Sequence, residues 1–192
     1  MRQLEQAERE DSGRGLQFVW LEPEVGFQWM SLTALKDDAF DDSLDTAGIG
    51  AVLGAGAGLR LLYLTAGARF RYLLLSPFQL WSLGFEAALR VPRGRWEPYV
   101  TLGVGYASVV RFVDDSDPIA SNVSASGVTT RLGGGIDHYV TPVFSIGARA
   151  DFEFLFTWRK AMAGADAGSV YAARGSAIGL GASASLVLGL HF

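Results

Sequence analysis

The segment from Ala177 to Phe192 alternates between apolar residues and small or polar residues over its whole length. Every second residue from Ile178 to Phe192 is apolar, and the residues between them are mostly glycine, serine and alanine. Successive side chains of a β-strand point to opposite faces, so this period of two predicts a strand with one oily face and one small or polar face. No other feature of the sequence constrains the fold as strongly.

The same alternation recurs along the chain and predicts eight strands in total. An even number of strands, each of about ten residues or more, is the pattern of outer-membrane β-barrels. We therefore expect an all-β fold, a closed eight-stranded antiparallel up-and-down transmembrane β-barrel. The expected strands are Val19–Ser31, Gly48–Arg60, Leu62–Leu74, Leu80–Val91, Pro98–Val113, Val128–Val140, Val143–Arg159 and Ala177–Phe192.

Composition excludes several other classes of protein. Hydrophobic residues make up 49% of the 192 residues, yet no uncharged apolar run is long enough for a membrane-spanning helix, which needs about 18 residues or more. The net charge of −4 does not favour a nucleic-acid partner. The absence of cysteine excludes disulfides, thiol nucleophiles and cysteine-based zinc sites. We expect a polar, flexible segment over residues 1–14, and one barrel domain over residues 15–192.

The connections between the expected strands alternate in length. Long acidic or small-residue loops are expected at Lys36–Asp45, Asp114–Ser126 and Lys160–Ser176, with one short exception at Leu75–Phe78. Short links are expected at the other end of the barrel, at Arg60–Tyr63, Pro92–Glu97 and His138–Pro142. Outer-membrane barrels have long extracellular loops and short periplasmic turns. This asymmetry predicts that both chain termini are periplasmic.

The residues of the polar face decide between a membrane barrel and a soluble lipocalin-like one. No lysine falls in an expected strand, because Lys36 and Lys160 lie in or beside loops, whereas a water-facing sheet commonly carries lysine. Arginine and acidic residues nearly balance on this face, and arginine forms the two-pronged bonds that make buried ion pairs tolerable. We therefore expect a charge network in the lumen, made of Glu22, Glu24, Arg60, Arg69, Arg71, Glu86, Arg90, Arg111, Arg131, Asp137, Arg149, Asp151, Glu153 and Arg159.

The oily face carries almost no charge, and its aromatic residues tend towards strand ends. Trp29, Tyr72, Trp81 and Trp158 occupy such positions, as do the aromatic girdles of membrane barrels. A charge on this face at the middle of a bilayer would cost about 2–4 kcal/mol, so the near absence of charge favours contact with lipid.

With these features the chain resembles the OmpA/OmpX-type small outer-membrane β-barrels over about residues 15–192. The most specific element is the terminal run Leu186, Leu188, Leu190 and Phe192, which resembles the family's C-terminal targeting signal. The resemblance implies insertion by the barrel-assembly machinery, residence in the outer membrane of a Gram-negative bacterium, and contact with outer-membrane lipid and lipopolysaccharide. We also expect a monomer.

Three functions remain open at this point. The leading one is a structural or loop-mediated binding role for a barrel whose lumen is filled by side chains. The alternative is a narrow or gated, porin-like channel, although an eight-stranded barrel has an interior just wide enough for side chains. A lipid-modifying envelope enzyme comes third, because the two histidines, His138 and His191, are expected at the periplasmic end and cannot serve a site facing the outer leaflet. We expect no enzymatic activity, no cofactor and no metal, and the acidic loops are interpreted as solvated charge.

Overall fold

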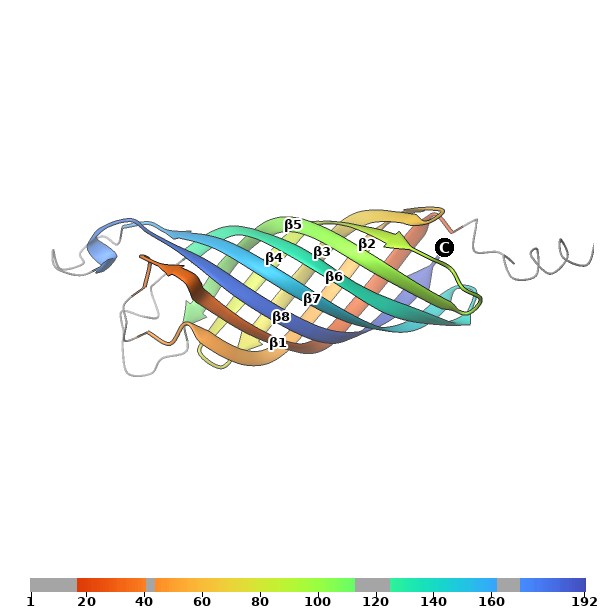
Figure 1. Cartoon of the computed structure of the whole chain (residues 1–192), viewed down its shortest axis with the longest axis horizontal. Coiled ribbons are helices and arrows are strands. Elements are labelled where there is room, and N and C mark those ends of the chain that lie inside the picture. The colour runs from red at the N-terminus through yellow and green to blue at the C-terminus, as the bar shows by residue number, and fades with distance from the viewer. Residues whose placement is uncertain (1–16, 41–43, 113–124, 162–169) are drawn as a thin grey trace, which may run out of the picture.

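The computed structural model describes residues 17–40, 44–112, 125–161 and 170–192, and its strands form a closed barrel (Figure 1). Each strand pairs antiparallel with the next along the chain, and β1 pairs with β8. The expected fold class is therefore confirmed. The strands are β1 (Val19–Asp37), β2 (Ala47–Leu61), β3 (Leu64–Leu75), β4 (Phe78–Arg90), β5 (Trp96–Phe112), β6 (Ala125–Thr141), β7 (Phe144–Arg159) and β8 (Gly175–His191), with a short 3₁₀ helix, η3 (Val170–Ala172), before β8.

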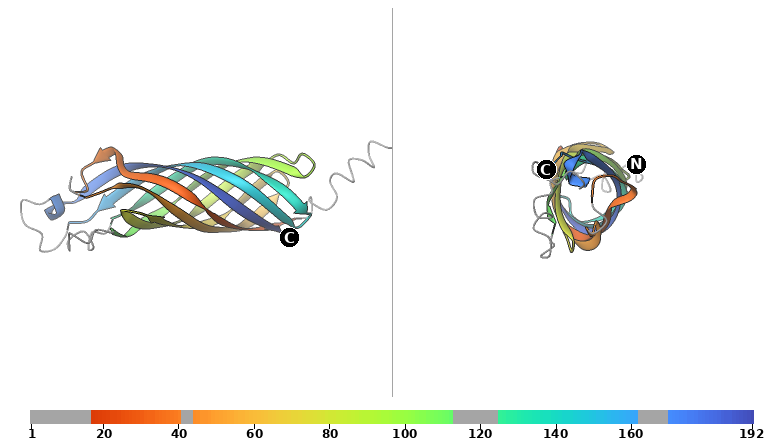
Figure 2. Two further views of the ribbon diagram at one scale, coloured as in Figure 1. Left: turned by 90° about the horizontal axis from the view of Figure 1, so that it is seen from below. Right: turned by 90° about the vertical axis from the view of Figure 1, so that its left-hand side faces the viewer.

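Closure brings the two ends of the described chain together. Trp20 of β1 lies opposite His191 of β8, and the backbone N–H of Phe18 donates to the carbonyl oxygen of Phe192 at 2.6 Å. The C-terminus and the start of β1 lie at the same end of the barrel, which also carries the short turns (Figures 1 and 2). A closed ring of strands leaves no open edge, so every strand can satisfy its backbone hydrogen bonds without water.

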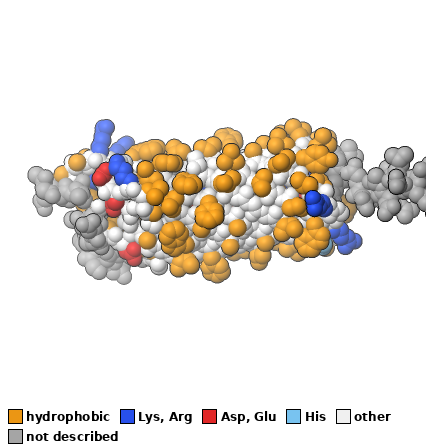
Figure 3. All heavy atoms as spheres, in the orientation of Figure 1, with side chains coloured by type: hydrophobic (Ala, Val, Ile, Leu, Met, Phe, Trp, Pro, Cys, Tyr) orange, Lys and Arg blue, Asp and Glu red, His pale blue; other side chains and the backbone are white. Residues whose placement is uncertain are grey.

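The two faces of the wall differ in the way that the alternation predicts. Outward side chains are apolar and open to the surroundings: Phe27, Phe85 and Phe152 are 70%, 75% and 69% exposed. Arg69 and Arg71, which point inward, are at most 1% exposed. On the face drawn in Figure 3, hydrophobic side chains surround the middle of the barrel and charged ones lie only towards its two ends. Such a surface is suited to hydrocarbon rather than water.

Aromatic side chains gather on the outer surface towards the end with the long connections. The ring of Trp81 lies 6.5 Å from Phe70 and 5.6 Å from Tyr106. Trp29 and Trp158 are each about half exposed towards the same end. These side chains occupy the position of an interfacial girdle, where the apolar part of a ring meets lipid and its polar edge meets water.

Some strands extend further than the sequence predicts, above all β1, which continues to Asp37. The register shifts in three of the strand pairs, and one of these shifts changes which side chains face the lumen. The pairing of β4 with β5 shifts between Gln79 and Leu80, so that Gln79 lies opposite Arg111 but Leu80 lies opposite Val109. The extra residue reverses the faces beyond it: Phe112 points inward and Arg111 outward. The predicted flexible segment 1–14 and most of the predicted loop 114–126 lie outside the described residues.

The turn between β2 and β3 has no glycine, asparagine or proline, yet it is tight. Leu62 adopts a φ of 55°, in the left-handed region that bulky residues rarely enter. The guanidinium of Arg60 donates from Nε to the carbonyl oxygen of Leu62 at 3.3 Å, which helps to hold this conformation. Leu61, Leu62 and Tyr63 are all well exposed, so this end of the hairpin is entirely apolar on its surface.

Placing a charged residue on the outward face tests whether this face contacts lipid. Phe152→Arg lies midway along β7 and should lower the free energy of unfolding in lipid vesicles by about 2–4 kcal/mol, because arginine is costly at the bilayer midplane. Trp158→Arg, at the girdle, should cost only about 0–1 kcal/mol on the same scale. Denaturant titration of both refolded variants measures the difference. Equal costs at the two positions would contradict a depth-dependent lipid environment.

Candidate functional site

The part of the lumen nearer the termini is filled by a network of arginine and carboxylate side chains. Glu86 of β4 lies at its centre, with Oε2 3.2 Å from Arg69 Nε and 2.5 Å from Arg149 Nη2. Arg149 also binds Asp151, two residues along β7, at 2.8 Å. The alternation of β7 points both of these side chains into the lumen, and the register places β3, β4 and β7 around one interior.

The network extends from this centre to β1. Arg69 binds Glu22 at 2.7 Å and Glu24 at 3.1 Å. Arg71, the next inward residue of β3, binds Glu24 at 3.0 Å and Glu153 of β7 at 3.5 Å. Glu22, Glu24 and Glu86 therefore each bind two arginines, and each of these arginines reaches a strand that is not its neighbour. These ion pairs across the lumen fix the positions of opposite strands relative to one another.

A second group of charged side chains closes the end that carries the termini. Arg90 binds Glu22 at 2.6 Å and Asp137 at 2.5 Å, which links this group to the centre. Arg60 forms a two-pronged pair with Glu97, at 2.7 and 3.0 Å, and also donates to the hydroxyl of Tyr139 at 2.8 Å. These side chains are almost completely buried. Buried charges are tolerated only when they are paired and hydrogen-bonded, a condition that this geometry meets.

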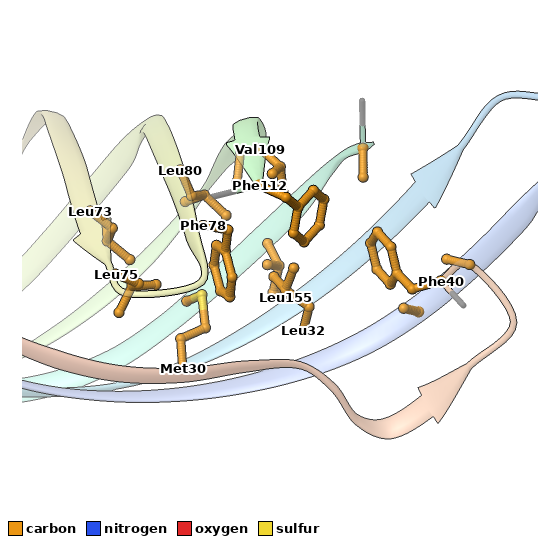
Figure 4. Close-up of a cluster of buried hydrophobic side chains, with 14 of the residues drawn as sticks. Met30, Leu32, Phe40, Leu73, Leu75, Phe78, Leu80, Val109, Phe112 and Leu155 are labelled. Carbon is orange, nitrogen blue, oxygen red and sulfur yellow. The ribbon is translucent and has the colours of Figure 1, made fainter. Parts of the chain in front are cut away.

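The other part of the lumen is apolar, which the sequence analysis did not predict (Figure 4). Five of its side chains point inward and are fully buried: Met30, Leu32, Leu73, Leu80 and Leu155. The rings of Phe78 and Phe112 lie 5.9 Å apart, and Phe112 meets Phe40 of the β1–β2 connection at 5.5 Å. A packed apolar layer thus lies beyond the charged one, so two layers of different chemistry follow one another along the lumen.

Arg159 lies at the mouth of the barrel farther from the termini, next to the apolar layer. Its guanidinium donates to the carbonyl oxygens of Ala39 at 2.6 Å and Tyr171 at 3.4 Å, and it stacks 4.9 Å from the Tyr171 ring. Arg159 is buried, as expected of a lumen residue, but its position ties the β1–β2 and β7–β8 connections to the barrel. It lies apart from the charge network of the other half.

The structure places the predicted lumen residues as follows. Arg131 is buried on the inner face of β6, opposite Glu153 in register. Apart from Arg159 and Arg111, the other predicted members form the ion pairs described above. The prediction for Arg111 is wrong, because the irregularity in β5 turns it to the exposed outer surface. Glu97 was missed, since the prolines and glycine around it indicated a turn; the structure includes it in β5, fully buried. The residues of the predicted terminal signal, Leu186, Leu188, Leu190 and Phe192, all face outward.

His191 and Ser145 form the only contact in the described lumen that resembles a nucleophile and its base. Ser145 Oγ and His191 Nε2 are 3.0 Å apart, as in a hydrolytic pair. Both side chains are only 1% exposed, and within the described residues His191 Nδ1 has no hydrogen-bond partner to orient the ring. The pair therefore joins β7 to the end of β8 without access for a substrate. No group of three or more metal-ligating side chains occurs among the described residues.

Comparison with solved structures shows the same architecture in other proteins. The crystal structure of Neisserial surface protein A (NspA) matches 91% of this chain and 97% of its own, with 14% identity and a TM-score of 0.66. The chain has the fold of the OmpA/OmpX-type outer-membrane β-barrels. Weaker matches are Ail, the attachment invasion locus protein of Yersinia pestis (15% identity, 90% and 98% covered, TM-score 0.44), and the outer membrane enzyme PagL (15%, 90% and 99%, TM-score 0.45).

No protein-family model and no curated protein sequence matches the chain. Among the described residues, no helix has the length and apolar character needed to cross a membrane. The resemblance to an outer-membrane barrel, first indicated by the alternation and the terminal run, is confirmed at the level of the fold.

Removing Arg149 should leave Glu86 and Asp151 with one fewer cation in a buried site. We expect Arg149→Met to lower the free energy of unfolding by about 3–5 kcal/mol, the cost of breaking a buried pair on one side. Combining it with Glu86→Gln should cost less than the sum of the two single changes. Denaturant titration in vesicles measures this cycle. The exposed Arg111→Gln is the control, and strict additivity of the Glu86 and Arg149 changes would contradict the network.

Proposed function

We propose that the protein is an integral outer-membrane barrel with a sealed lumen, which serves as a structural element or as a scaffold that presents its long loops for binding. The observation that carries the proposal is the filling of the lumen by two successive layers. Ion pairs centred on Glu86 occupy one half, and the apolar cluster around Phe78 and Phe112 occupies the other. Solutes would have to disrupt both layers to pass.

The proposed orientation follows from the connections. The ends with short turns, such as Leu62–Tyr63 and Gly94–Arg95, lie on the side of the termini and are assigned to the periplasm. The longer connections, 38–46, 113–124 and 160–174, would then face the exterior. The outward-facing terminal run, ending at Phe192, is the segment that we expect the insertion machinery to bind, because its apolar side chains remain exposed along the wall.

Exposed cations at the outer end favour contact with the phosphate groups of lipopolysaccharide. Lys36, Lys160 and Arg174 lie on the β7, β8 and β1 side of the barrel, just beyond the half-exposed Trp158, and Arg111 lies above the aromatic group at Trp81 on the other side. Cations beyond an aromatic girdle are placed at headgroup level.

We infer that the protein is a monomer, because lipid alone can cover its apolar outer surface. We also infer a non-catalytic role, because the Ser145–His191 pair is buried and closed to a substrate.

A planar-bilayer recording tests the sealed lumen against the channel alternative. Purified protein refolded from detergent should produce no reproducible conductance steps above the detergent background, because the proposed sealed lumen would leave no continuous aqueous path through both layers. The same recording with a known porin, in the same detergent, controls for insertion. Reproducible steps of constant size would contradict the proposal and favour a narrow channel.

A further inference from the structure

One hollow interrupts the lipid-facing wall, over the strands β3, β4 and β5. It has a volume of about 390 Å³ and is lined almost entirely by apolar surface. Ala66 and Ala87 form its floor, and Phe85, Leu102 and Val104 form its sides. The register explains its shape: Ala66 pairs with Ala87, and Ala87 with Leu102, so two small side chains meet between larger ones. Its size is at the lower end of small-molecule sites, roughly 300–1,000 Å³.

The hollow lies in the half of the wall nearer the termini, and the β4–β5 hairpin continues beyond it. At about 3.3 Å per residue and a strand tilt of about 40°, Arg93 lies roughly 15 Å below Ala87 along the barrel axis. That distance is about half the hydrocarbon thickness of a bilayer, roughly 30 Å in full. A hydrocarbon chain that occupies the hollow would therefore have its headgroup at the level of this hairpin.

The hairpin tip presents two exposed arginines in a fixed conformation. Arg93 and Trp96 exchange backbone hydrogen bonds at 2.7 and 3.1 Å, and Gly94 takes a φ of 60° at the first position of the two-residue turn. Arg93 and Arg95 flank this glycine and are both exposed, and Trp96 is half exposed beside them. A tight turn of this kind needs glycine at that position, and it fixes the backbone from which both arginine side chains extend.

The neighbouring β2–β3 turn indicates how far the hydrocarbon layer of the membrane reaches along the barrel at this end. Leu61 pairs with Leu64, and Leu64 with Leu89, so the apolar turn at Leu62 and Tyr63 ends near the level of Arg90, well short of the tip at Gly94. The exposed side chains of that turn are suited to the lipid interior. The longer β4–β5 hairpin therefore carries Arg93 and Arg95 beyond the level of this turn, to the level of the headgroups, where cations interact favourably with anionic lipid.

From these observations we propose that the hollow over β3, β4 and β5, together with Arg93 and Arg95, binds one anionic glycerophospholipid of the periplasmic leaflet. An acyl chain lies in the hollow against Ala66 and Ala87, and the phosphate lies between the two arginines. Charge complementarity selects an anionic headgroup over a zwitterionic one. This proposal rests on the proposed placement of the barrel in a bilayer, and it adds a bound lipid that the sealed-lumen function does not require.

Native mass spectrometry of the refolded full chain tests this site. The barrel is mixed in detergent with phosphatidylglycerol or phosphatidylethanolamine, and the fraction that retains one lipid after detergent removal is measured. We expect preferential retention of phosphatidylglycerol. Neutralising both arginines (R93Q/R95Q) should lower that preference by about fivefold for each arginine lost, the factor that corresponds to one cation at an anionic surface. Filling the hollow with Ala87→Phe should lower the retention of both lipids.

A matched variant separates this site from nonspecific association. Ala55→Phe enlarges an exposed alanine elsewhere on the lipid-facing wall, and it should retain phosphatidylglycerol as the unmodified protein does. Equal retention of the two lipids, unchanged retention in Ala87→Phe, or an equal loss in Ala55→Phe would overturn the proposal. A shift in gel mobility on heating shows that each variant is folded. This control distinguishes the loss of the lipid site from the loss of the barrel fold. If Ala87→Phe does not fold, Ala66→Leu replaces it.

Discussion

The structure depends on the pairing of arginines with carboxylates inside the barrel, above all on Glu86 between Arg69 and Arg149. A membrane barrel places its apolar side chains outward, so it must fill its interior with what remains. Unpaired charges there would be very costly, whereas shared carboxylates satisfy several guanidinium groups at once. Because Glu22, Glu24 and Glu86 each contact two arginines, opposite strands are tied together across the lumen.

The interior is divided into two halves with different chemistry. The half nearer the termini is held by ion pairs, and the other half is packed with aliphatic and aromatic side chains such as Leu80 and Phe112. Arg159 then fastens the connections at the mouth through their carbonyl oxygens. Each half contributes side chains of a different kind to the lumen, and this filling is the basis of the proposed scaffold role. The wall itself remains available for lipid, and the hollow over β3, β4 and β5 lies beside the charged half.

The number of strands, the two faces and most lumen residues could be predicted, because a period of two is unambiguous wherever one face is polar. The prediction of the lumen residues failed where the two faces of a strand no longer differ in polarity or where the register shifts. In the run from Tyr72 to Leu75 both faces are apolar. The alternation that begins at Arg69 and Arg71 places Leu73 inward, but the residue types give no sign that an apolar layer lies inside the barrel. The one-residue shift opposite Gln79 leaves no mark in the residue pattern, and it exchanged the places of Arg111 and Phe112.

The charge network shows the same limits. Glu97 follows Pro92 and Gly94 and precedes Pro98, and these residues indicated a turn, although the hairpin reverses at Gly94 and Arg95 and leaves Glu97 within the strand. Which carboxylate each arginine would bind could not be predicted, since the pairs join strands far apart in sequence. Arg60 and Glu97, for example, meet only after the barrel has closed.

The apolar face of the wall points to lipid and the charged face to the lumen. Electrophoresis of the protein refolded with and without lipid or detergent tests this arrangement most directly. We expect that folded barrel, with different gel mobilities before and after heating, forms only when detergent or lipid is present. A folded, monodisperse protein in plain buffer would contradict it and would support a soluble barrel with its oily face inward.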